Sequence, residues 1–374
     1  MNGLPKILLL GDYSNCQFTL ATGLKKLGAD VTLISNGSKW LDCERDIDIS
    51  RKPGKLGGLQ LYYRLLGPLH RHLRGYDIVV VNDPNFVELR PSRLRWLFDR
   101  LRRDNGQVHL MAMCTDVPLL DMYEASDCPI SYSEWFINGS PSPYLAANPE
   151  KWRQWHHPDL VDYQNYFYDN IDGAIAVLYE YYLSLQRRLP AEKIAYSGIP
   201  IDLDRFKFAA LPDEIDRVKL FLGRDRNRML FKGTDLLEKA ARIVVDRHPG
   251  AVNLEIVENR PFREFTELLT NSHIVLDQIY SYTPGTTALM AMAYGKNVVS
   301  GGEEDYYKFI GESTNRPIIN APVSLEELVE TIDSAVSRPE LLAERGRHSH
   351  QFVVDHNDSL KVARRVLDFL TRSR

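Results

Sequence analysis

The chain has 374 residues, more than a single hydrophobic core of ordinary size holds, and this length suits two domains. Hydrophobic residues make up 44% and charged residues 26%, which excludes a disordered or fibrous chain, and the net charge of -4 excludes a generally basic, nucleic-acid-binding one. No window approaches the roughly 18 apolar residues of a membrane span. The first residues lack a secretory apolar region, and the four cysteines have no Cys-x-x-Cys spacing. We therefore expect a reduced, cytoplasmic protein.

The first half alternates strands and helices. Residues 6–35, KILLLGDYSNCQFTLATGLKKLGADVTLIS, contain a buried strand, a turn at Gly11, an amphipathic helix and a second strand, which is a βαβ unit and predicts a parallel sheet. Further strands are expected in residues 76–84, 107–116, 172–178 and 192–200, with a helix within 90–106. Residues 119–170 are rich in Pro, Asn, Trp and Tyr and interrupt this rhythm, so we expect an insertion near a site there.

The alternation restarts after Pro200. Strands are expected in residues 217–223, 252–258 and 273–280, with helices from Thr234 and over 261–271. No Gly-x-Gly-x-x-Gly follows the first strand, which argues against a dinucleotide fold of the usual kind. Because ligands of open α/β sheets bind at the carboxyl ends of the strands, the loops after each strand are where we expect functional residues.

The turn TPGTT, residues 283–287, lies between an expected strand and an apolar helix. The first N–H groups of a helix have no partner within it and, with the helix dipole, can bind an anion. The hydroxyls of Thr286 and Thr287, and the close approach allowed by Gly285 after Pro284, would strengthen such a site. An ordinary threonine-capped helix would give the same pattern.

A second candidate anion site follows the first strand of the second half. Arg224, Arg226, Arg228 and Lys232 lie within nine residues, and Gly233 opens a helix. Arginine can donate two parallel hydrogen bonds to a diphosphate, and lysine interacts with it as a point charge. A solvated basic loop is the alternative, but both clusters belong to one expected sheet, and together they favour a single diphosphate site.

Several segments resemble a known family. GRDRNRMLFKGTDLL (223–237) resembles the Arg and Lys-Gly segment of retaining GT-B glycosyltransferases of the broad family 4 type, and TALMAMAYGKNVVSGG (287–302) resembles their LEAMACGxPVV helix and strand. The resemblance is greatest to a bacterial subgroup linked to surface polysaccharides, and it also covers LLLGDYSNCQFTLATGLKKLGADVTLIS, RDIDIS, YSEWFI, VENRPFREF, DQIYSYTP and RPIIN. It implies an α/β fold of two Rossmann-like domains facing a central cleft.

The resemblance also implies a separate role for each domain. Residues 1–198 would form the acceptor domain, residues 199–354 the nucleotide-sugar donor domain, and a helix over about 355–374 would pack back on the first. Arg228 and Lys232 would neutralise the leaving diphosphate without a metal or other cofactor, with Arg224 as a third member. Family members retain the anomeric configuration, generally by front-face attack, so no protein nucleophile is expected.

One departure from the family concerns its Glu-x7-Glu pair, which contacts the donor sugar and the ribose. These positions fall on Tyr282 and Met290 here. Glu303, Glu304 or Glu258 could supply the missing carboxylate, although each could equally be a solvated loop charge.

The first half would bind a glycan or lipid-linked acceptor through polar residues that follow its strands. These are Gly11, Asp12, Tyr13, Ser14, Asn15, Asn82, Asp83, Thr115 and Asp116. Asp116 is the candidate for orienting the acceptor hydroxyl, because the family often carries a polar residue after this strand, but it could also be a helix-capping aspartate.

Residues 51–103 hold twelve Lys and Arg against four Asp and Glu, and LYYRLLGPLHRHLRGY (61–76) adds aromatic and leucine side chains. Such a surface can hold an enzyme at an anionic membrane, here at its inner face, although a solubilising face has the same composition. A nucleotide-sugar 2-epimerase of similar fold and a non-catalytic nucleotide-sugar-binding protein are the main alternatives to a transferase. A two-lobed solute-binding protein fits less well, since we find no export signal.

Overall fold

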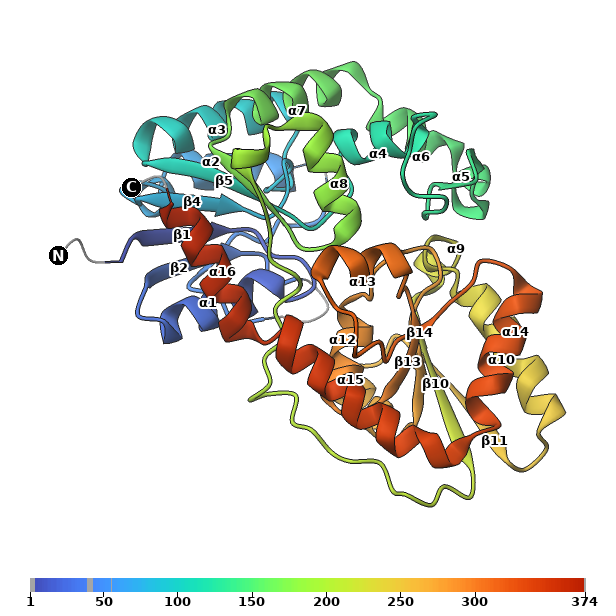
Figure 1. The fold of residues 1–374 in the computed structure, drawn as a ribbon. Coiled ribbons are helices and arrows are strands. Elements are labelled where there is room, and N and C mark those ends of the chain that lie inside the picture. The colour runs from blue at the N-terminus through green and yellow to red at the C-terminus, as the bar shows by residue number, and fades with distance from the viewer. Residues whose placement is uncertain (1–3, 39–42, 55, 373–374) are drawn as a thin grey trace. The chain divides into compact units, whose positions relative to one another are not determined.

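The computed structural model describes residues 4–38, 43–54 and 56–372. The chain folds into two compact units (Figure 1). The first contains Met1–Met122, Glu150–Pro200 and Ser359–Arg374, and the second contains Tyr123–Pro149 and Ile201–Asp358.

The first unit is built on a seven-stranded parallel sheet in the order β3-β2-β1-β4-β5-β8-β9. Its central strands are apolar on both faces because helices cover both. The strands are β1 Lys6–Leu10, β2 Asp30–Ser35, β3 Ile47–Asp48, β4 Ile78–Val81, β5 Gln107–Ala112, β8 Gly173–Ala176 and β9 Ile194–Tyr196. The helices are α1 Cys16–Lys26, α2 Gly57–Leu66, α3 Pro91–Asp104, α4 Val117–Glu124, α6 Pro149–Trp155, α7 Pro158–Asn170, α8 Tyr179–Arg188 and α16 Ser359–Thr371.

The C-terminal helix α16 packs along α1 (Figure 1). A Cβ atom at Gly23 of α1 would lie 2.7 Å from the carbonyl oxygen of Ser359 and 2.8 Å from the Cβ of Ala363. Glycine at position 23 therefore allows this close helix contact. The helix begins at Ser359 rather than near residue 355, because α15 ends at His356 and the carbonyl of Asn357 accepts a hydrogen bond from the N–H of Ile201.

The second unit contains a five-stranded parallel sheet in the order β11-β10-β12-β13-β14. Helices α10 and α14 pack together, as do α12 and α15 (Figure 1). The strands are β10 Val218–Arg224, β11 Val252–Glu258, β12 Ile274–Leu276, β13 Asn297–Ser300 and β14 Ile319–Asn320. The helices are α5 Pro143–Ala147, α9 Met229–Lys232, α10 Thr234–Arg247, α11 Phe262–Thr270, α12 Thr286–Ala293, α13 Glu304–Ile310, α14 Leu325–Val336 and α15 Leu342–His356. None of the helices in the described ranges is long and apolar enough to cross a membrane.

The segment Tyr123–Pro149 departs from the expected division at residue 198. It belongs to the second unit, although it lies within the first half of the sequence. It contains the hairpin of β6 Phe136–Ile137 and β7 Ser140–Pro141, and Ile137 packs against the hydrophobic core of the second unit. Placing the whole of residues 1–198 in one domain was therefore wrong, because long-range packing, which spacing along the chain does not reveal, decides where this segment folds.

Candidate functional site

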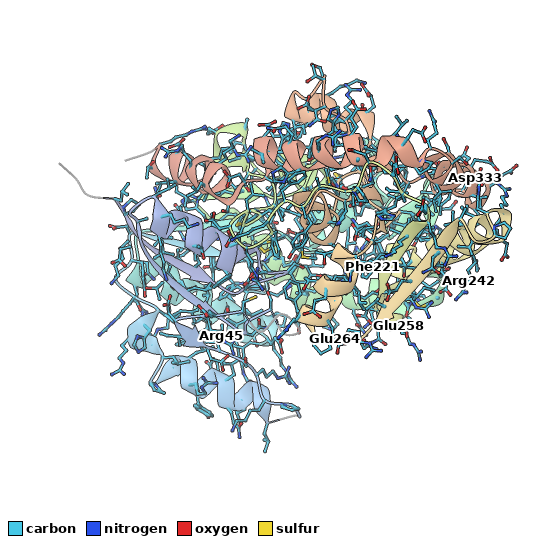
Figure 2. All side chains as sticks on the ribbon, turned by 90° about the horizontal axis from the view of Figure 1, so that it is seen from below. Arg45, Phe221, Arg242, Glu258, Glu264 and Asp333 are labelled. Atoms are coloured by element: carbon cyan, nitrogen blue, oxygen red, sulfur yellow. The ribbon has the colours of Figure 1, made fainter. Side chains whose placement is uncertain are left out.

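The carboxyl ends of β10 and β11 carry a network of charged side chains. Arg224 donates hydrogen bonds to Glu258 and to Glu238, and Arg242 donates to Glu238 at 2.7 Å. Arg226 Nε donates to Glu258 at 2.8 Å. Glu258 and Arg242 mark this network in Figure 2. The guanidinium of Arg224 and the carboxylate of Glu258, both predicted as donor-binding groups, are thus engaged with each other.

Lys232 ends α9 and lies beside a buried carboxylate. Its Nζ is 3.5 Å from Oδ1 of Asp277, whose side chain is only 1% exposed, and Oδ2 of Asp277 accepts a hydrogen bond from the Ser300 hydroxyl at 3.0 Å. Asp277 was not predicted as a site residue, although its place directly after the buried strand β12 was a usable signal in the sequence. The Lys232 side chain is 27% exposed, so the cation that pairs with Asp277 is not fully buried.

Arg228 lies over an aromatic group in which the segment Tyr123–Pro149 takes part. Its guanidinium carbon is 5.0 Å from the ring centre of Phe231, and that ring packs edge-on against Tyr144 at 5.0 Å and Trp135 at 6.5 Å. Trp135 is almost fully buried. The arginine side chain therefore rests on a rigid apolar support.

The turn before α12 has the form expected of an open helix N-terminus. Gly285 is the N-cap residue, and among the described residues no side chain caps the helix. Thr286 and Thr287 are the first two helical residues and are partly exposed, whereas Pro284 is buried. The turn follows β12, which neighbours β10, so the two predicted anion-binding clusters do end neighbouring strands of one sheet.

Neither residue at the positions of the family's glutamate pair is free to replace it. Met290 is buried in the core. The hydroxyl of Tyr282 accepts a hydrogen bond from the N–H of Ser131 at 2.8 Å and lies 2.7 Å from the Ser131 hydroxyl. Tyr282 thus anchors the segment Tyr123–Pro149 within the second unit.

The two glutamates after β13 differ in their surroundings. Glu304 is exposed and pairs with Arg316 and, at 3.9 Å, with Lys308. Oε1 of Glu303 accepts hydrogen bonds from the Tyr132 hydroxyl at 2.6 Å and from Nδ2 of Asn320 at 2.7 Å. Only Glu303 is fixed by uncharged donors at the carboxyl edge of the sheet.

The carboxyl edge of the first sheet carries acidic side chains. Asp12 follows β1, and its Oδ1 accepts a hydrogen bond from the N–H of Gln17 at 3.0 Å in α1. Burial raises the pKa of Asp12 to about 6. A Cβ at Gly11 would lie 1.9 Å from Oδ1 of Asn82, so glycine lets these two strand ends meet. Of the other residues predicted after β1, Tyr13 is exposed, and Ser14 and Asn15 have positive φ values of 52° and 68° that turn the chain into α1.

Asp83 and Asp116 follow the neighbouring strands β4 and β5. Burial, together with the nearby charge of Asp116, raises the pKa of Asp83 to about 7. Burial raises the pKa of Asp116 to about 6, although the hydroxyl of Tyr168 donates to its Oδ2. Oδ1 of Asp116 accepts from the N–H of Leu119 at 3.0 Å, which is the geometry of a helix cap for α4. In the described part of the chain no group of three or more His, Cys, Asp or Glu side chains is arranged to hold a metal ion.

The basic region of residues 51–103 contains α2, the turn after it, the buried strand β4 and most of α3. Lys55 lies outside the described residues. Leu56 is 67% exposed and Tyr63 is 62% exposed. Arg93 and Arg100 stack on Tyr62 and Trp96, respectively. A surface depression beside them is lined by His70, Arg71, Arg74, Gly75, Arg103 and Asp104.

The chain was compared with known proteins. No protein-family model matches the sequence, and no curated protein does. Among solved structures, HepE from Anabaena in complex with UDP-glucose is 14% identical with a TM-score of 0.61, over 98% of this chain and 100% of HepE. WaaG, a glycosyltransferase involved in lipopolysaccharide biosynthesis, is 13% identical with a TM-score of 0.58, over 98% of this chain and 99% of WaaG.

A candidate UDP-N-acetylglucosamine 2-epimerase from Listeria monocytogenes is 12% identical with a TM-score of 0.54, over 98% of this chain and 95% of that protein. At such low identity these likenesses show the fold, which is the GT-B type with two Rossmann-like units. The predicted fold class is confirmed.

Proposed function

We propose that this protein is a glycosyltransferase that moves a sugar from a nucleotide-sugar donor to a glycan or lipid-linked acceptor, with retention of configuration, in surface polysaccharide synthesis. The observation that carries the proposal is the pairing of Lys232 with the buried Asp277 at the carboxyl edge of the second sheet. A partly exposed ammonium group held from beneath by a carboxylate is suited to receiving an anionic ligand.

The chemistry of such a transfer places little demand on covalent catalysis. As the bond between the sugar and the diphosphate breaks, negative charge grows on the diphosphate oxygens, and donors already aimed at them lower the barrier. Lys232 and Arg228 supply the charges, and the open N-terminus of α12 at Thr286 and Thr287 supplies backbone N–H groups. This set of donors balances the charge without a metal.

The comparisons support the donor class. HepE, of the same fold, is described with UDP-glucose bound, and WaaG of the same fold is a glycosyltransferase. The acidic edge of the first sheet suits the acceptor, because carboxyl groups such as the partly exposed Asp83 and the buried Asp116 can accept hydrogen bonds from sugar hydroxyls.

The exposed basic surface of α2 and α3 would place the enzyme at an anionic membrane that carries the acceptor. Purified protein should then sediment with vesicles containing anionic lipid and release them as salt rises. Replacing Arg71, Arg74, Arg100 and Arg103 with glutamine should weaken this binding, while transfer to a soluble acceptor analogue survives. Equal sedimentation with neutral and anionic vesicles, or none with either, would contradict a membrane role.

The test of the proposed function begins with a thermal-shift screen of nucleoside diphosphates and their sugar conjugates, because a ligand that binds the folded state raises the melting temperature. Each donor that binds is then incubated with and without glycan acceptors. A transferase forms a glycosylated acceptor, whereas an epimerase converts the donor sugar without any acceptor. Donor binding without either product would favour a non-catalytic binding protein, and the absence of any binding would overturn the proposal.

A further inference from the structure

The segment Tyr123–Pro149 contacts the rest of the second unit at Tyr282 and Glu303, both predicted to bind the donor. It also contacts Phe231, which directly precedes Lys232 in the sequence. Ser131 is hydrogen-bonded to Tyr282, Tyr132 to Glu303, and the rings of Trp135 and Tyr144 pack on Phe231. Ring centres of Tyr132 and Tyr282 are also 4.8 Å apart. The segment therefore forms part of the structure around the site rather than a loose insertion.

Glu303 is the side chain that this segment holds in place. The Tyr132 hydroxyl and the Asn320 amide both donate to its Oε1, at 2.6 and 2.7 Å, while its backbone N–H donates to the carbonyl of Tyr282 at 3.2 Å. In the part of the chain that the structure describes, neither a hydrogen bond nor an ion pair engages Oε2. One carboxylate oxygen is thus fixed, and the other is left to accept hydrogen bonds.

The alternatives to Glu303 are both neutralised by arginine. Glu258 pairs with Arg224 and Arg226, and Glu304 pairs with Arg316. A carboxylate that already accepts from a guanidinium is a weaker acceptor for a sugar hydroxyl than one held by a phenol and an amide. Among the three candidates, Glu303 is the carboxylate whose surroundings suit a neutral polyhydroxyl ligand.

The position of Glu303 also places it close to the cationic group. Ser300, which donates to Asp277 beneath Lys232, precedes Glu303 by three residues. Even a fully extended chain of three residues spans at most about 11 Å. A sugar attached to a diphosphate at Lys232 would therefore lie within reach of Glu303.

We propose that Glu303 accepts hydrogen bonds from hydroxyl groups of the donor sugar, in place of the missing glutamate pair, and that Tyr132 is the positioning residue that orients its carboxylate. This inference rests on the proposed function, since it assigns the sugar part of the same donor site. It makes the segment Tyr123–Pro149 a determinant of which donor is bound.

The experiment compares binding of a nucleoside diphosphate with binding of its sugar conjugate by titration calorimetry. UDP, GDP and ADP are tested with UDP-glucose, GDP-glucose and ADP-glucose on the full chain. For the pair that binds, Glu303→Gln should lower the affinity for the sugar conjugate about ten- to hundredfold and leave the affinity for the diphosphate unchanged. The reason is that a charged hydrogen-bond acceptor is lost only from the sugar subsite. Tyr132→Phe, which keeps the ring, should weaken the conjugate about three- to tenfold.

Two matched controls accompany these variants. Glu304→Gln removes the neighbouring carboxylate, and Tyr63→Phe removes an exposed hydroxyl of the first unit; both should bind like the wild type. Thermal unfolding of every variant checks that it is folded, and Glu303→Asp replaces Glu303→Gln if the latter does not fold.

The outcomes separate this inference from the proposed function. If the wild type binds none of the probes, the proposed function fails and this inference fails with it. A second outcome is that the wild type binds, while Glu303→Gln either keeps its affinity for the sugar conjugate or loses affinity for the diphosphate and the conjugate equally. Either result overturns the role of Glu303, and the proposed function stands. If Glu303→Gln binds the sugar conjugate more weakly but Tyr132→Phe binds it like the wild type, the positioning role of Tyr132 is overturned.

Discussion

The carboxyl edges of the two parallel sheets differ in their charged groups, because among the candidate site residues only those of the second sheet include lysine and arginine side chains. In the first unit the strand ends carry Asp12, Asp83 and Asp116, and burial raises the pKa of each carboxyl group. In the second unit they carry Arg228 on an aromatic support and Lys232 beside a buried aspartate. One topology therefore presents an acidic edge and a basic edge.

This difference is the basis of the roles proposed for the two units. A diphosphate is repelled by buried carboxylates and attracted by cations, so the basic edge of the second sheet suits the donor. Because its pKa is about 7, Asp83 holds a proton about half of the time at neutral pH, and it could then both donate to and accept from a sugar hydroxyl, as an acceptor site would require. In this proposal the chemistry of the strand ends, rather than the fold, separates the two roles.

The largest expected effect is on turnover, when a cation at the carboxyl edge of the second sheet is removed. Lys232→Ala and Arg228→Ala should each reduce turnover on the order of a hundredfold, about 3 kcal/mol of transition-state stabilisation, because each removes a charge aimed at the leaving diphosphate. Steady-state kinetics and circular dichroism would separate catalysis from folding. Lys239→Ala, an exposed lysine of α10, is the control. Near-normal turnover in both variants would remove the proposed diphosphate site.

The acidic edge should make stability depend on pH. Asp83 loses its proton near pH 4 in the unfolded chain but near pH 7 when folded, so its burial destabilises the fold increasingly as pH rises from about 4 to 7. Asp83→Asn should remove this dependence, and its free energy of unfolding relative to the wild type should rise by up to roughly 4 kcal/mol between pH 4 and pH 8. Denaturant unfolding at both pH values measures the difference. A difference that does not change with pH would show that the Asp83 carboxyl is not desolvated.

Most of the fold was accessible from the sequence. Continuous apolar runs such as the one that forms β4 predicted strands buried on both faces, and Gly233, with φ of 72°, does open α10 as predicted. The prediction that both anion-binding clusters belong to one sheet is also confirmed, and the structure adds that they follow the neighbouring strands β10 and β12. The roles of Arg228, Lys232, Thr286 and Thr287 stay predictions.

What the sequence did not reveal depends on contacts between distant residues. Ser131 meets Tyr282 across 151 positions, and Tyr132 meets Glu303 across 171. No local periodicity predicts such pairs, so the segment Tyr123–Pro149 was assigned to the wrong unit. Asp277 differs, because a polar residue directly after a buried strand is a local signal that was available.

A buried base in the second unit should respond to pH in the opposite sense. Burial lowers the pKa of Lys296 to about 8, so the unfolded chain binds more protons between about pH 8 and 10.5 and stability from this group rises with pH there. At pH 7 the charged lysine destabilises the fold, and Lys296→Met should increase the free energy of unfolding by roughly 1–2 kcal/mol. Urea unfolding at pH 7 and pH 10 tests this. A variant less stable than the wild type at pH 7 would contradict the prediction.

The smallest expected effect is that of removing divalent metal, for which no change in rate is predicted. In the proposed function, Arg228, Lys232 and the N–H groups of α12 would balance the charge that develops on the diphosphate, so no metal ion would be required. Transfer is measured in excess EDTA and again after adding magnesium or manganese. If activity is lost in EDTA and either ion restores it, the cations of the second sheet do not balance the charge of the diphosphate without a metal. The carboxylates of the acidic edge would then be the first residues to test as metal ligands, and the division of roles between the two edges would have to be redrawn.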